Sequence, residues 1–272
     1  MSYFQLSEHN GVLSAGCNIS LLGTKLNTFA YLVDGLAIDT GPSKFKKDYM
    51  NFFTAHRLER AVLTHYHEDH SGNAALLEKS GTEIYIHPAA ISLCLANAKI
   101  PFYRRIFWGP RSKFSPRAVG SEINGRTRTF KIIEVPGHSF DHIAVYDPVE
   151  GSFFTGDLFV TSKTKIVMKH ENIYSIMDSL KKILGYDFTT VYCAHAGVVK
   201  NGREMIKKKV EYLENLVGEV VALKEKGLSI AEINKKIFPR TAPLTLVSGK
   251  EWSSEHIIRS IISDKDNRIE KQ

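Results

Sequence analysis

The pattern of hydrophobic and polar positions changes character along the chain. Over the first two thirds, short apolar runs bounded by turn residues alternate with longer runs that have helical spacing. Strands are predicted at 27–39 (two strands hinged at Asp34-Gly35), 60–64, 83–87, 129–135, 142–146, 152–155 and 189–194. Helices are predicted at 44–56, 71–80 and 172–184. Strands and helices mixed in this order predict an α/β sandwich.

Helical spacing dominates from Asn201 onward. One predicted helix carries an apolar stripe, at positions Ile206, Val210, Leu213, Val217 and Val220. Ser229 and Glu232 form an S-x-x-E capping box that would open a second helix, and 253–263 predicts a third. We therefore expect an α/β domain over residues 1–200 and a helical appendage over 201–272.

The most informative segment is 64–73, which reads THYHEDHSGN. It joins a predicted strand to a predicted helix, and loops on a rigid scaffold often carry functional side chains. Burying its three histidines and two carboxylates without partners would cost roughly 1–3 kcal/mol each. His65 and His67 can lie on one side of the chain, whereas Asp69 and His70 turn toward a different point. This spacing predicts two adjacent metal ions, and imidazole and carboxylate ligands suit Zn, Fe or Mn.

Three more polar residues follow apolar runs and lie beside glycine. They are His138 in the tripeptide PGH, Asp157 in TGD and His195 in AHAG. Together with the HxHxDH motif at 65–70, they resemble the metallo-β-lactamase superfamily, and Asp39 in an early DTG matches it too. The resemblance covers roughly residues 27–197.

This resemblance implies a four-layered αβ/βα sandwich, with the metals at one edge of the catalytic domain and the helical appendage after it. The ligands that it implies are His65, His67 and His138 for the first metal, Asp69, His70 and His195 for the second, and Asp157 as the bridge. The flavodiiron branch carries Glu at the position of His67, which disfavours a redox di-iron role. Lactonases of the superfamily carry a pocket Tyr shortly after the bridging Asp. Leu158, Phe159 and Val160 occupy that stretch here.

Two close divalent ions, with Zn favoured over Fe or Mn, would hold a hydroxide at neutral pH and stabilise the oxyanion that its attack creates. Asp69 is the candidate catalytic residue, because it could bind metal and also orient the nucleophile or carry its proton. Asp39 is expected to support the metal loop and Glu68 to be a solvated spacer. His142 has a structural or supporting role.

Charge draws attention to residues 99–131. The chain has 36 Lys and Arg against 29 Asp and Glu, a net charge of +7. The segment 99–131 holds nine of the basic residues and one acid, with six aromatic residues interleaved, so the rest of the chain has 27 basic and 28 acidic residues. We expect a loop or helical hairpin that reaches over the site. Its arginines and aromatics could bind RNA, clamp the phosphates of a carrier such as a CoA thioester, wall an apolar acyl pocket or lie at a membrane surface. A basic solvated loop is the alternative.

The sequence therefore predicts a dinuclear metal-dependent hydrolase that uses a metal-bound hydroxide to cleave an ester, thioester or lactone-type acyl bond, resembling glyoxalase II. The alternatives are an RNA phosphodiester hydrolase and a non-catalytic ligand-binding protein. A small-molecule acyl substrate is favoured as the partner, RNA is kept open, and a homodimer is compatible with the apolar helical stripe. Candidate substrate contacts are Arg104, Arg105, Phe107, Trp108, His170 and Tyr174.

Composition adds little beyond class and compartment. Hydrophobic residues make up 43% and charged residues 24%, as in ordinary globular proteins. The three cysteines are widely spaced and predict no disulfide framework, which suits a reducing cytoplasm. No apolar run is long enough for a transmembrane helix, and no signal peptide is expected.

Overall fold

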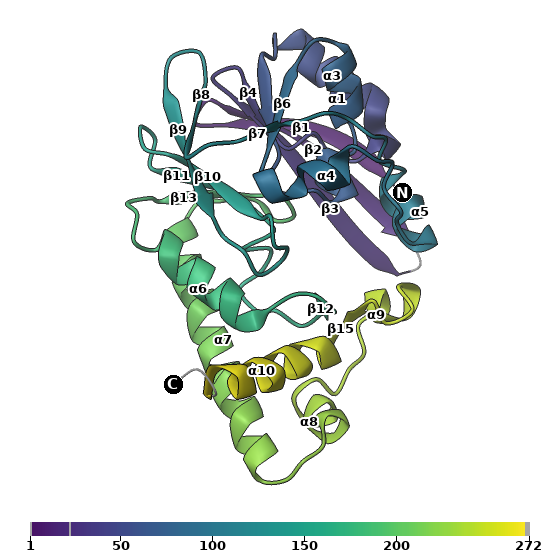
Figure 1. Ribbon diagram of the computed structural model, residues 1–272, viewed down its shortest axis with the longest axis vertical. Coiled ribbons are helices and arrows are strands. Elements are labelled where there is room, and N and C mark those ends of the chain that lie inside the picture. The colour runs from purple at the N-terminus through teal and green to yellow at the C-terminus, as the bar shows by residue number, and fades with distance from the viewer. Residues whose placement is uncertain (1, 22, 270–272) are drawn as a thin grey trace.

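Two β-sheets stacked face to face form the body of the protein. The computed structural model describes residues 2–21 and 23–269. The first sheet has the strand order β1-β2-β3-β4-β5-β6-β7 (Figure 1). Its strands are β1 (Tyr3–His9), β2 (Val12–Leu21), β3 (Thr24–Val33), β4 (Leu36–Ile38), β5 (Arg60–Val62), β6 (Glu83–Ile86) and β7 (Arg117–Ala118). The strands from β1 to β4 pair antiparallel, and those from β4 to β7 pair parallel.

The second sheet has the order β14-β13-β11-β10-β9-β8. Its strands are β8 (Glu122–Asn124), β9 (Thr129–Glu134), β10 (Ile143–Asp147), β11 (Ser152–Gly156), β13 (Thr190–Cys193) and β14 (Gly197–Val199). The pair β11 and β13 is parallel, and the other pairs are antiparallel. The chain therefore leaves β11 and β13 at the same edge of this sheet.

Helices cover the outer face of each sheet and complete four layers. The helices of the first half are η1 (Ser43–Phe45), α1 (Lys46–Ala55), α2 (Glu68–Ser71), α3 (Ala74–Lys79), η2 (Pro88–Ala90), α4 (Ile91–Cys94) and α5 (Phe102–Trp108). On the other side lie α6 (Ile173–Ile183) and α7 (Gly202–Glu225), followed by α8 (Ile230–Ile237), α9 (Pro243–Val247) and α10 (Ser254–Ile269). The predicted α/β sandwich is confirmed.

Successive side chains along a strand point to opposite faces of its sheet and so belong to different apolar cores, of which the described residues form three. In β3, Ala30 and Leu32 pack under the helices of the first sheet, whereas Tyr31 and Val33 face the second sheet. In β10, Ala144 faces α6 and α7, whereas Val145 faces the first sheet. Both faces of the central strands are therefore buried, which explains why β4, β10, β11 and β13 are near-continuous apolar runs.

The short strands β12, β14 and β15 were not predicted, and the sequence prediction differs from the structure in two larger regions. Strands β1 and β2 were not predicted, because β1 is largely exposed and its sequence YFQLSEH lacks a clear apolar face. The segment 99–131 is not one loop or hairpin over the site. It contains α5, β7, β8 and the start of β9, and only its first part approaches the loops that carry the histidines. The strand pairing of its later part draws it into the two sheets.

The C-terminal segment, residues 201–269, packs against the second sheet and returns to the body. Ser229 and Glu232 form the predicted capping box of α8. After α9, the short strand β15 (Trp252–Ser253) pairs with β12 (Val167–Met168), and α10 then lies across α6, α7 and α8 (Figure 1). Among the described residues, none of the helices is long and apolar enough to span a bilayer. The three cysteines are free and buried.

A buried lysine ties α7 to the loop after β11. Lys209 is 4% exposed, and its Nζ donates hydrogen bonds to the backbone oxygens of Leu158 (2.9 Å) and Phe159 (2.5 Å). Burial lowers the pKa of Lys209 to about 8. The loop that it holds begins at Asp157, so α7 helps to set the position of that carboxylate.

We expect Lys209→Met to lower the free energy of unfolding by about 2 kcal/mol, because two buried carbonyls lose a charged donor. Urea denaturation at pH 7 measures this, with the exposed neighbour Lys208→Met as the control, for which we expect a change below about 0.5 kcal/mol. The pKa of about 8 lies below the ordinary 10.5. The folded parent therefore binds fewer protons than the unfolded chain between these values, and it should gain stability relative to the variant as pH rises through them. Equal stability of the two variants would contradict this account.

Candidate metal centre

Four loops bring the predicted ligands together at one edge of the two sheets. His65, His67, Asp69 and His70 follow β5 and continue into α2. The others follow β9 (His138), β11 (Asp157) and β13 (His195). Asp39, at the end of β4, lies among them with a φ of +63°, in the left-handed region. Short buried strands place each of these side chains at the start of a loop, which is why each follows an apolar run in the sequence.

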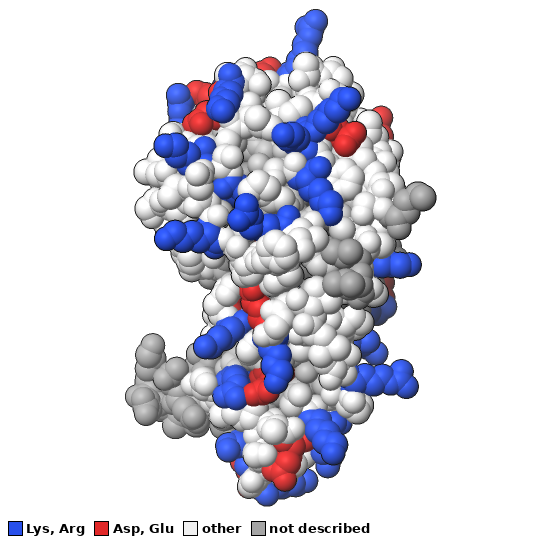
Figure 2. Space-filling model, turned by 90° about the vertical axis from the view of Figure 1, so that its right-hand side faces the viewer, with Lys and Arg blue, Asp and Glu red and all other residues white. Residues whose placement is uncertain are grey.

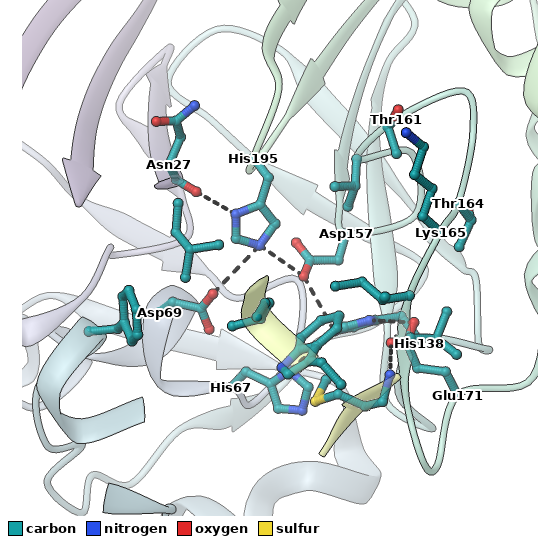
Figure 3. Close-up of a pocket in the computed structure, with 18 of the residues that line it drawn as sticks. Asn27, His67, Asp69, His138, Asp157, Thr161, Thr164, Lys165, Glu171 and His195 are labelled. Carbon is teal, nitrogen blue, oxygen red and sulfur yellow. Dashed lines mark hydrogen bonds and ion pairs between the residues drawn. The ribbon is translucent and has the colours of Figure 1, made fainter. Parts of the chain in front are cut away.

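The seven predicted ligands form overlapping groups. Ligand atoms lie within 4.8 Å of one another in three sets: His65, His67 and His138; His65, His70 and Asp157; and Asp69, His70 and His195. Asp157 lies between the outer two sets. Its Oδ1 is 3.2 Å from His70 Nε2. Its Oδ2 is 3.3 Å from His138 Nε2 and 3.0 Å from His195 Nε2 (Figure 3). This arrangement matches two neighbouring cation sites with Asp157 between them.

The chemistry of these atoms fits divalent metal ions. His67 Nδ1 lies 3.0 Å from His65 Nε2 and 3.2 Å from His138 Nε2, so three ring nitrogens converge although few protons are available to join them. His70 Nε2 and Asp157 Oδ1 are buried 3.2 Å apart, and neither makes a hydrogen bond to a further group within the described part of the chain. Burying this pair away from water is costly, and a bound cation would give both atoms a further partner.

Burial and charge act differently on the histidines. Burial lowers the pKa of His65 and of His67 well below the usual value, with neighbouring imidazoles adding to the effect, so both rings are in the neutral form that binds metals. Burial also opposes the charged form of His70 and His195. The carboxylates outweigh it, led by Asp157, so that the pKa of His70 rises well above its usual value and that of His195 to about 9. The negative charge of the carboxylates around His70 and His195 therefore favours a cation at this position.

Surrounding groups orient the ligands through their second ring nitrogen or backbone. Asp39 accepts a hydrogen bond from His70 Nδ1 (2.7 Å) and from the amide of Thr64 (2.8 Å), which places it as the support that the sequence predicted. Burial lowers the pKa of His142 to about 3, so its ring is neutral. It donates from Nδ1 to the backbone oxygen of Val135 and accepts from the amide of Asp157 at Nε2.

The sequence prediction missed two supporting carboxylates. Glu171 Oε2 accepts from His138 Nδ1 (3.0 Å), and its Oε1 accepts from the amide of Met168 (2.7 Å). Asp141 Oδ2 accepts from the amide of Tyr66 (2.9 Å) and so holds the loop between His65 and His67. Neither carboxylate belongs to a local motif, and the contacts with His138 and Tyr66 bridge distant parts of the chain.

The prediction for Glu68 was wrong. It was expected to be a solvated spacer, but it is 2% exposed and forms an ion pair with Arg104 on α5. Alternation along a strand led to the prediction, whereas residues 68–71 form the helix α2, which turns Glu68 toward α5.

A cleft of about 490 Å³ opens above the ligands. Its apolar wall comes from α5, from the loop 160–168 and from the C-terminal segment, with Phe107, Trp108, Val167, Leu244 and Trp252. Lys25, Lys163 and Lys165 also line it and are exposed. Figure 3 shows Lys165 on a loop beside Thr161 and Thr164, away from the imidazoles.

The structure brings only some of the predicted substrate contacts to this cleft. Arg104, Phe107 and Trp108 line it, with Arg104 already paired to glutamates. Arg105, His170 and Tyr174 are not among the lining residues. The ring of His170 lies 5.9 Å from that of His67, and Tyr174 packs against the core between the second sheet and its helices. The lysines and the C-terminal residues of the wall were not predicted, because no local pattern distinguishes them.

Comparison with known proteins supports the same family. A β-lactamase-like protein 2 homolog of Caenorhabditis elegans is 27% identical over 208 residues, which are 74% of this chain and 61% of the relative. The chain thus spans about three fifths of that relative. A hydroxyacylglutathione hydrolase of Pseudomonas savastanoi pv. phaseolicola is 24% identical over 212 residues, 76% of this chain and 74% of the relative.

A solved structure has the same fold. A metallo-β-lactamase family protein of Thermus thermophilus superposes with a TM-score of 0.61 at 14% identity, covering 96% of this chain and 90% of that one. The superfamily is metal-dependent, and the His and Asp groups described above could hold two metal ions. The family model of the metallo-β-lactamase superfamily matches residues 23–195, more than half of the sequence, and the chain belongs to this superfamily.

Proposed function

We propose that this protein is a dinuclear metal-dependent hydrolase of acyl esters or thioesters, with zinc as the metal. The observation that carries the proposal is that the overlapping groups of His and Asp ligands lie beneath a cleft with an apolar wall. Nitrogen and oxygen ligands without thiolate suit zinc. A relative named hydroxyacylglutathione hydrolase supports an acyl substrate.

The residues of the site have distinct roles in such a reaction. Divalent ions held here would lower the pKa of water and stabilise the negative charge that develops on the acyl oxygen. Asp69 lines the cleft, and its Oδ2 lies 3.6 Å from both His70 Nε2 and His195 Nε2. We infer from this position that Asp69 accepts a proton from the attacking water and delivers it to the leaving group.

The walls of the cleft suit the two ends of an acyl substrate. Phe107, Trp108 and Trp252 offer apolar surface for an acyl group. Lys25, Lys163 and Lys165 offer positive charge for an anionic leaving group or carrier. A substrate that is apolar at one end and anionic at the other matches both surfaces.

The charges of segment 99–131 do not form a track for RNA phosphates. Arg104 and Arg111 are largely buried, and Arg117 pairs with Glu83. The remaining ion pairs in this segment are Arg126 with Glu59, and Arg128 with Asp147 and Glu150. Figure 2 shows Lys and Arg side chains dispersed over one face of the molecule, with acidic side chains next to several of them. Four of the segment's nine basic residues therefore have carboxylate partners and a fifth, Arg111, is buried, so an acyl substrate is the better proposal.

A substrate panel tests the reaction class. The zinc-loaded protein should turn over acyl thioesters or aryl esters faster than lactones, phosphodiesters or a short RNA. Asp69→Asn should lower kcat by at least about 100-fold, because a positioned proton carrier is lost. The control Asp48→Asn, on the exposed side of α1, should retain activity. Turnover of RNA or phosphodiesters alone, or full activity of Asp69→Asn, would contradict the proposal.

Glu171→Gln should weaken zinc binding by roughly 10- to 100-fold, because carboxylates that orient a ligand histidine contribute about this much. Glu171 accepts the two hydrogen bonds with two different oxygens, one from His138 and one from the backbone N–H of Met168. A glutamine side chain has a single acceptor oxygen, so one of the two hydrogen bonds is lost. Competition with a chromophoric chelator measures the affinity. Glu214→Gln removes a surface carboxylate paired with Lys181 and should leave the affinity unchanged. Equal affinities for the two variants would show that Glu171 does not orient His138.

A further inference from the structure

Arg104 lies at the centre of a buried ion-pair network beside the metal ligands. Its Nε is 2.6 Å from Glu68 Oε1 and its Nη2 is 2.8 Å from Glu68 Oε2, which is a two-pronged pairing. Its Nη1 is 3.3 Å from Glu251 Oε1. The side chain of Arg104 is 11% exposed, that of Glu68 2% and that of Glu251 27%. This guanidinium is committed to protein partners and is not available to clamp a substrate anion.

The two glutamates belong to different parts of the site. Glu68 lies between the ligands His67 and Asp69 and opens α2. Glu251 belongs to the C-terminal segment, next to Trp252, which lines the cleft and pairs with Met168 in the β12–β15 ladder. Arg104 thus joins the ligand loop to the wall that the C-terminal segment contributes.

Arg104 also approaches β12 from the side of the cleft. Its Nη1 lies 3.7 Å from the sulfur of Met168. The amide of Met168 donates to Glu171, the carboxylate that orients His138. The same guanidinium therefore contacts three elements that surround the metal centre: α2, β12 and the segment before β15.

The two-pronged pairing of Arg104 with Glu68 fixes the position of one side chain relative to the other. Two parallel hydrogen bonds between a guanidinium and a carboxylate fix distance and orientation together. Removing one partner of a buried pair leaves an uncompensated charge, which is more costly than removing both. Lysine cannot replace arginine here, since a single ammonium lacks the fork geometry.

We propose that Arg104 is a positioning residue that orients the ligand loop through Glu68 and the C-terminal wall of the cleft through Glu251. The proposal rests on the proposed hydrolase function for its kinetic consequences. The pairing of Arg104 with Glu68 (the Glu68 arm) and its pairing with Glu251 (the Glu251 arm) have different effects. The Glu68 arm acts on Asp69 and the metal ligands, and hence on kcat and metal affinity. The Glu251 arm acts on Trp252 and the apolar wall, and hence on KM for substrates with long acyl groups.

Kinetics and metal affinity of matched variants separate the arms. We expect Glu251→Gln to raise KM for a long-chain acyl thioester about tenfold, a change of about 1.4 kcal/mol, with kcat and zinc affinity unchanged. Glu68→Gln should lower kcat and zinc affinity by a similar factor. Arg104→Met should show both effects, and Arg104→Lys should not restore them. The control Arg117→Met breaks an exposed arginine–glutamate pair of the same segment and should change none of these quantities.

One further measurement tests the proposal without relying on catalysis, and one further variant tests it if Arg104→Met is unstable. Hydrogen exchange of residues 244–253 should speed up in the metal-free Glu251→Gln and Arg104→Met proteins, and less in Glu68→Gln. If Arg104→Met does not fold, the double variant Glu68→Gln/Arg104→Met removes both charges of the fork, and it should fold with weakened zinc binding. Identical kinetic profiles and exchange rates for Glu68→Gln and Glu251→Gln would overturn the role of Arg104. Absence of acyl turnover with the exchange pattern intact would instead overturn the hydrolase proposal.

Discussion

The constraint on which the structure depends is the burial of a dense set of ionisable side chains between two sheets. His65, His67, His70, His138 and Asp157 are all less than one tenth exposed. Such groups are stable away from water only when each is paired, neutral or bound to a cation. Bound metal ions, together with the carboxylates that surround the ligands, would satisfy that requirement.

The supporting residues come from the first sheet and from the helices on both sides of the sandwich. Asp39 at the end of β4 holds His70 and Thr64, and Glu171 before α6 holds His138. Lys209 on α7 holds the loop after Asp157, and Arg104 on α5 holds α2 through Glu68. The C-terminal segment therefore serves the site twice, through the buried lysine and through the wall that contains Trp252. Its packing therefore contacts both the loop after Asp157 and the cleft above the ligands.

Local patterns in the sequence were sufficient for the fold class and for finding the residues that converge. The spacing of HxHxDH and the glycine-flanked His138, Asp157 and His195 are short-range features that remain visible without a structure. Strand pairing and ion pairs between distant segments are not visible in this way. Glu68 was misassigned because its partner Arg104 is 36 residues away, and Glu171 lies 33 residues from His138. The basic segment 99–131 was expected to form one loop or helical hairpin over the site, whereas strand pairing and ion pairs divide it between the two sheets.

We propose that this edge of the sandwich can hold two metal ions in adjacent sites that share Asp157. Native mass spectrometry of the zinc-loaded protein tests it most directly, because it counts ions per chain without reference to any substrate. The account predicts two zinc ions per chain in the parent and fewer in Asp157→Ala with the fold retained. A single ion per chain in the parent at saturating zinc, or two ions retained in Asp157→Ala, would contradict it.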